Sequence, residues 1–168
     1  MSFRDEALEA NAAYAAEFPS GERSAPPTRR VAVLTCMDAR LRPEDALGLA
    51  LGEAHVIRNA GGRVTDDAVR SLMLSSAVLG TRRVAVIHHT DCGLLGATDE
   101  VLRDQVAAVT GERADDVEFL AFHDAEGALL DDVRAIERDA RLPFDEVSGF
   151  LYDVATGRLR PVVPSSPG

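Results

Sequence analysis

Short apolar runs rich in β-branched residues alternate along this chain with segments of helical periodicity, and this alternation limits the possible folds most strongly. The runs lie at residues 31–35, 54–58 and 83–89, and residues 65–79 between the second and third carry apolar positions at helical spacing. Strands that alternate with helices form parallel sheets, because a parallel connection must cross over the sheet. The pattern predicts an α/β fold with a mostly parallel β-sheet flanked by helices.

The remaining elements follow from capping and turn signals. Pro43 is placed to open a short helix over 44–49, and Thr65 is placed to cap the helix that begins after it. Two further helices are expected at 98–109 and 125–138. A strand is expected at 150–154, followed by a turn and a run at 159–163 that pairs back antiparallel.

The N-terminal segment differs from the rest of the pattern. Residues 2–18 are expected to form an amphipathic helix capped by Ser2, and a Pro- and Gly-rich linker follows it. We therefore divide the chain into an arm at 1–28, a single α/β domain at 29–163 and a frayed tail at 164–168. A helix set apart by such a linker is a candidate for packing on a partner chain.

Composition excludes several classes of protein. The 168 residues suit one domain, and the net charge of −10, with no lysine, argues against nucleic-acid binding and excludes Schiff-base chemistry on a lysine. Two cysteines do not make a disulfide scaffold. No apolar run approaches the ~18 residues of a membrane span, so we expect a soluble cytoplasmic protein with no membrane partner.

Metal-binding side chains follow two of the expected strands. Cys36 and Asp38 come directly after the first strand, and His89 and Cys92 lie at the end of the third. If these strands are neighbours where the strand order reverses, the two thiols and the imidazole converge. Two Cys and one His match a zinc site with three protein ligands, which leaves a fourth position open, as in catalytic zinc sites.

Simpler readings of the same residues exist. Free cysteines are often small buried hydrophobic residues, and a Cys36–Cys92 disulfide is disfavoured in the cytoplasm. Asp38 and Arg40 could form a solvated surface ion pair of little energetic value. Beside a metal, however, Asp38 could ligate it or accept a hydrogen bond from bound water, and Arg40 could hold that carboxylate by paired donors.

Three sequence blocks, in order and at matching intervals, carry a specific resemblance. Residues 36–40 (CMDAR), 58–62 (RNAGG) and 89–93 (HTDCG) resemble the signature blocks of the β-class carbonic anhydrases. The resemblance is strong over about residues 30–95, and the short chain resembles the compact branch of that family. It implies a β-carbonic-anhydrase-like fold and a subunit that forms at least a homodimer.

The resemblance also implies a mechanism. Cys36, His89 and Cys92 match the family's ligands for one zinc ion per chain, whose bound hydroxide attacks CO2 to give bicarbonate reversibly. Asp38 and Arg40 match its catalytic dyad. Asp38 would orient the hydroxide, and it could bind zinc as a fourth ligand in a closed state once Arg40 releases it.

Other residues have supporting roles in this reading. Gly61, Gly62 and Gly93 are expected to allow close backbone approach or special turns near the pocket. Arg58 is expected to brace a loop. His88 precedes the ligand His89 in a strand, so it faces the opposite side and is expected to be packed.

Two alternative functions stay open at this stage. The same zinc hydroxide could hydrolyse another linear molecule, such as carbonyl sulfide or carbon disulfide. The chain could instead be a zinc-binding or redox-sensing module without turnover. An intact Asp38–Arg40 pair argues against that second alternative, since a passive site needs neither residue.

Overall fold

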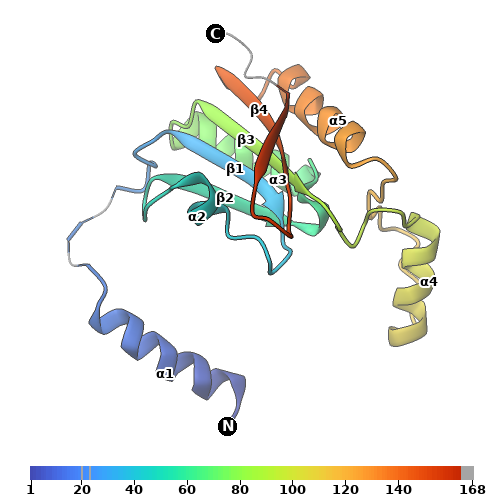
Figure 1. Cartoon of the computed structure of the whole chain (residues 1–168), viewed down its shortest axis with the longest axis horizontal. Helices are drawn as coiled ribbons and strands as arrows, with labels where there is room; N and C mark the ends of the chain where they lie inside the picture. The colour runs from blue at the N-terminus through green and yellow to red at the C-terminus, as the bar shows by residue number, and fades with distance from the viewer. Residues whose placement is uncertain (20, 23, 164–168) are drawn as a thin grey trace.

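Five strands form one sheet at the centre of the molecule (Figure 1). The computed structural model describes residues 1–163 except residues 20 and 23. The strands are β1 (Val31–Cys36), β2 (Ala54–Asn59), β3 (Arg83–His89), β4 (Glu146–Tyr152) and β5 (Leu159–Val163). Their order is β2-β1-β3-β4-β5, with every neighbouring pair parallel except β4 and β5. The predicted mostly parallel sheet and its antiparallel last strand are confirmed.

The strand order reverses between β1 and β3. The chain runs from β1 to β2 on one side and then returns to place β3 on the other side of β1. In open α/β sheets, sites lie beyond the carboxyl ends of the strands at such a reversal. The candidate metal ligands follow these two strands, so the topology brings them to one place.

The helices begin where their capping residues predict. They are α1 (Phe3–Ala16), α2 (Pro43–Leu47), α3 (Asp66–Met73), α4 (Asp99–Thr110) and α5 (Ala125–Arg138). Ser2 caps α1 in a capping box, and the Thr65 hydroxyl accepts the N–H of Ala68 at the start of α3. A π-helical turn, η2 (Leu74–Val78), extends α3, and Gly80 follows it with a φ of 74°.

The predicted bounds of one strand were wrong. The last parallel strand spans Glu146–Tyr152 rather than 150–154. The sequence signal was weak because Ser148 and Gly149 interrupt the apolar run, although Val147 and Ser148 are both buried. Pairing with β3 outweighs the low strand propensity of Ser148 and Gly149.

The two faces of the sheet differ. Leu72 of α3 and Leu129, Val133 and Ile136 of α5 pack with β1, β3 and β4 in one apolar core. Val31, Ala85 and Phe150, on the other face, line a pocket together with Arg29 and Arg83. α3 and α5 therefore cover one face, and this pocket lies on the opposite face.

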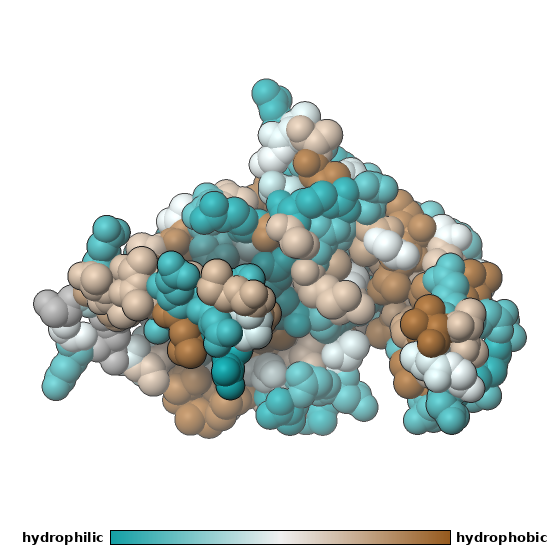
Figure 2. Space-filling model, turned by 90° about the horizontal axis from the view of Figure 1, so that it is seen from below, coloured by the Kyte–Doolittle hydropathy of each residue, from teal (hydrophilic) through white to brown (hydrophobic). Residues whose placement is uncertain are grey.

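α1 lies apart from the sheet, beyond the linker (Figure 1). All of its residues are exposed, including Phe3 at 83% and Leu8 at 65%. Figure 2, which looks at the molecule from the side of α1, shows apolar residues mixed with polar ones on this surface. Among the described residues, no helix combines the length and apolarity needed to span a bilayer. The predicted frayed tail, 164–168, lies outside the described residues.

Candidate metal centre

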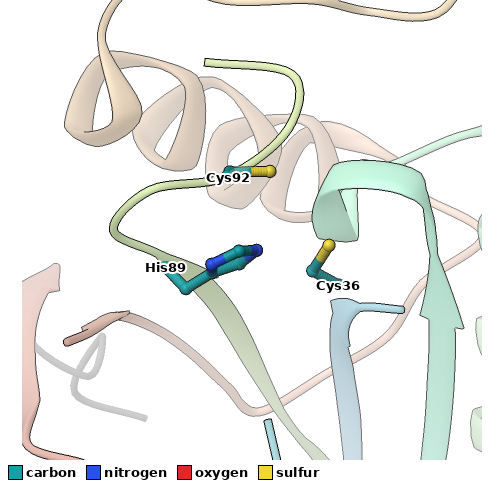
Figure 3. Close-up of side chains that lie close together, drawn as sticks. All are labelled: Cys36, His89 and Cys92. Carbon is teal, nitrogen blue, oxygen red and sulfur yellow. The ribbon is translucent and has the colours of Figure 1, made fainter. Parts of the chain in front are cut away.

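Cys36, His89 and Cys92 converge at the carboxyl ends of β1 and β3 (Figure 3). One candidate ligand atom from each lies within 4.8 Å of the other two. Cys36 is the last residue of β1, His89 is the last of β3, and Cys92 comes from the turn that follows β3. All three side chains are buried, with exposures of 5%, 1% and 7%. The two strands thus bring together residues more than 50 positions apart in the sequence.

The donor set fits a thiophilic cation. The hydrogen bond between the two thiols lowers the pKa of Cys36 to about 4 and, together with burial, raises the pKa of Cys92 well above its usual range. A cation at this position would instead favour the thiolate form of both sulfurs. Nε2 of His89 is buried without a hydrogen-bond partner among the described residues, while its Nδ1 lies 2.9 Å from the Thr90 carbonyl. Such an imidazole is oriented to offer Nε2 to a metal.

Asp38 lies beside this centre and is held by Arg40. Nε and Nη2 of Arg40 donate to the two carboxylate oxygens at 3.0 and 2.7 Å, and the Arg40 N–H donates to Oδ1 at 2.9 Å. These bonds hold the pKa of Asp38 well below its usual range. Oδ2 of Asp38 is 3.9 Å from Nε2 of His89. The carboxylate is therefore ionised and close to the position where a metal would lie.

Asp91 makes a contact that the sequence analysis missed. Nη1 of Arg40 donates to Oδ2 of Asp91 at 2.7 Å, and Nη2 donates to the Asp91 carbonyl at 2.9 Å. Asp91 has a φ of 55°, a left-handed conformation that an aspartate tolerates better than most residues. The turn between His89 and Cys92 thus anchors the guanidinium that holds Asp38.

The loop after β1 is braced from β2, as expected for Arg58. Its guanidinium donates to the carbonyls of Cys36 at 2.9 Å, Asp38 at 2.7 Å and Leu41 at 3.3 Å. Three hydrogen bonds from this one side chain to main-chain carbonyls fix the path of this loop. Arg58 therefore stabilises the loop that carries Cys36 and Asp38.

The three glycines near the site differ in whether their position requires glycine. Gly61 and Gly62, in η1 (Ala60–Gly62), have φ values of 76° and 69°. A Cβ on Gly62 would lie 2.8 Å from the Cys36 nitrogen, so this close approach requires glycine. The expectation was wrong for Gly93, which has no positive φ and whose added Cβ would meet nothing within 4 Å. The turn at that position leaves room for a side chain.

Comparison with known proteins identifies the family. A family model described as carbonic anhydrase matches residues 31–119. β-Carbonic anhydrase 1 of Mycobacterium tuberculosis is 42% identical over 168 residues, covering 98% of this chain and 100% of the relative. The crystal structure of a carbonic anhydrase from Streptococcus mutans has a TM-score of 0.91 at 43% identity, covering 97% and 99% of the two chains. A carbon disulfide hydrolase from an Acidianus strain is 35% identical, over 80% of this chain and 78% of the relative. The chain therefore belongs to the β-class carbonic anhydrase family.

Proposed function

We propose that this chain binds one zinc ion through Cys36, His89 and Cys92 and catalyses the reversible hydration of CO2 to bicarbonate. The observation that carries the proposal is the convergence of these three buried side chains beside an ionised carboxylate, Asp38. Three ligands leave a fourth position open, which a closed structural site would not do. Membership of the carbonic anhydrase family supports the same reaction.

The chain's own residues orient the reactants. Zinc, when bound, lowers the pKa of a water molecule so that a hydroxide nucleophile is available near neutral pH. Asp38 would accept a hydrogen bond from that nucleophile and so orient it toward the carbon of CO2. Addition of this oxygen to CO2 would form a new C–O bond as one C=O π bond opens, giving bicarbonate. A further water would have to lose a proton before the next turnover. Arg40 keeps Asp38 ionised and in place during the cycle.

The Asp38–Arg40 pair also serves as a gate in this proposal. The carboxylate is within reach of the centre, at 3.9 Å from Nε2 of His89, while Arg40 holds both of its oxygens. Release by Arg40 would free a carboxylate oxygen of Asp38 to act as a further ligand of a bound metal in place of water. Arg40 therefore favours the open, active state.

A second candidate, hydrolysis of carbon disulfide, is favoured by the similarity to the Acidianus carbon disulfide hydrolase. The same nucleophile would attack the carbon of CS2, and C–S cleavage would release H2S and leave carbonyl sulfide, which a second water would convert to CO2 and H2S. The two functions separate when stopped-flow CO2 hydration and H2S release from CS2 are measured on one zinc-loaded preparation. A rate of CO2 hydration far above the rate of H2S release supports the proposed function. H2S release together with CO2 hydration at only the background rate would show that the chain is a carbon disulfide hydrolase instead.

We also propose that the active protein is a homodimer, with α1 of each chain packing on its partner. α1 exposes Phe3, Leu8 and Tyr14, and the sheet face opposite α3 and α5 carries a pocket with apolar lining residues. Exposed apolar surfaces on two separate parts of a chain are typical of association sites. A second copy supplies both surfaces at once.

Deleting residues 2–18 should therefore weaken dimerisation. The expected result is a shift from dimer toward monomer in sedimentation velocity at low micromolar concentration, since the deletion removes the exposed apolar groups of α1. Replacing Glu9 of α1 with alanine keeps the apolar groups and should leave the dimer intact. A truncated chain that stays dimeric on dilution would show that α1 is dispensable for assembly.

A further inference from the structure

A buried carboxylate lies behind the metal centre without belonging to it. Asp132, on α5, has a side chain that is 6% exposed. Its Oδ2 accepts from Nε of Arg63 at 2.6 Å and from Nε2 of His88 at 3.0 Å, and its Oδ1 accepts from the N–H of Val64 at 3.1 Å. Burial raises the pKa of Asp132, but the hydrogen bonds from His88 and Arg63 outweigh it and keep the pKa below its usual value. The carboxylate is ionised, and both of its oxygens accept hydrogen bonds.

Two partners of this carboxylate adjoin metal-ligand positions. His88 directly precedes His89 in β3, and as expected its side chain is packed rather than directed at the centre. Arg63 follows η1, whose Gly62 lies against the backbone of Cys36 so closely that a Cβ would approach it to 2.8 Å. The Asp132 carboxylate thus connects the end of β3 with the segment that follows η1 and packs behind Cys36.

Arg63 extends the network to the third ligand position. Its guanidinium carbon lies 5.5 Å from the centre of the Phe122 ring, within the range of a cation–π contact. Phe122 forms two backbone bonds with the loop that follows Cys92, donating to the Leu94 carbonyl at 3.2 Å and accepting from the Gly96 N–H at 2.8 Å. The loop carrying Cys92 is therefore connected to the same buried carboxylate.

We propose that Asp132 is a positioning residue of the metal centre, and that its bonds to Arg63 and His88 hold the three ligand-bearing segments in register. The inference rests on the proposed zinc site. A buried ion pair adds little net stability because desolvating both charges is costly. Its value here is rigidity, since outer-shell partners of metal ligands typically change metal affinity by about 10- to 100-fold.

The test is a double variant, Arg63→Met with Asp132→Leu, which removes both charges and leaves neither unpaired. Zinc transfer from the loaded protein to a colorimetric chelator should become about 10- to 100-fold faster. The visible absorption bands of the Co²⁺-substituted protein should also shift, because the thiolate and imidazole ligands are held less uniformly. Asp132→Asn, which keeps the side-chain volume, should change both measurements in the same direction and serves if the double variant does not fold.

A matched control separates positioning from general stability. Val133 is the next residue of α5, is 1% exposed and belongs to the apolar core rather than to this network. Val133→Ala should lower the melting temperature while leaving the zinc transfer rate and the Co²⁺ spectrum unchanged. Wild-type transfer rates and spectra in both Asp132 variants would overturn the proposal and leave the proposed function intact. A wild-type chain that binds no zinc would overturn both.

Discussion

Cys92→Ala should lose both its zinc and its CO2 hydration activity. The substitution leaves a single thiolate and the imidazole of His89, while Arg40 holds the Asp38 carboxylate away from the metal position. Two ligands do not hold zinc in a protein site that uses three. Metal analysis after gel filtration should give well under one zinc per chain, compared with one for the wild type. Stopped-flow hydration should fall to the buffer rate.

The control for this variant is His123→Ala, which removes an exposed histidine outside the centre and should keep one zinc per chain. Unfolding in the presence of a chelator should be similar for Cys92→Ala and the wild type, since neither then holds metal. Full zinc content in Cys92→Ala would refute the assignment of Cys92 as a ligand.

Arg40→Ala should retain zinc but lose most of its activity. Without the paired donors of Arg40, the Asp38 carboxylate is free to occupy the fourth ligand position. Asp38→Ala should also retain zinc and fall by about 100-fold or more, because the nucleophile loses its orienting acceptor. Arg40→Lys should restore little, since an ammonium group cannot reproduce a planar pair of donors. CO2 hydration from neutral to alkaline pH, with zinc content measured in parallel, checks all three variants.

The chain contains a matched control for this pair. Arg141 donates to Asp139 through the same three groups, at 3.0, 2.9 and 2.7 Å, and lowers the pKa of Asp139 to about 2. This pair has the same local geometry but is no part of the Cys–His–Cys cluster. Arg141→Ala should leave activity unchanged. Wild-type activity in zinc-replete Arg40→Ala would contradict the gating role and leave only the metal assignment.

The sequence predicted the fold well where local signals agree with tertiary packing. Thr65 and Ser2 cap the helices that they were expected to cap, and the run at 83–89 is a strand over the same residues. The prediction failed at β4, where Ser148 and Gly149 obscure a strand that pairing with β3 stabilises. The position of the candidate site could also be predicted from the sequence, because sites in parallel sheets lie where the strand order reverses.

The Cys–His–Cys cluster was predictable for the same reason, since its members follow two strands that the sequence already marked. The contacts of Asp132 and Asp91 were not predictable. Arg63 and Asp132 are 69 positions apart, on a loop and a helix whose docking no local pattern reveals. Asp91 acts through a left-handed turn conformation that appears only in the folded chain. Gly93 shows the converse error, because a glycine beside a ligand needs neither a positive φ nor a close contact.

Removal and return of zinc tests the central claim most directly. Stopped-flow CO2 hydration is measured on the purified protein, on the same protein after the metal has been stripped by a chelator, and again after one equivalent of zinc per chain is restored. We expect activity to disappear on stripping and to return in proportion to the zinc bound by Cys36, His89 and Cys92. Hydration that persists in the zinc-free protein, or a fully zinc-loaded protein without hydration, would contradict the assignment.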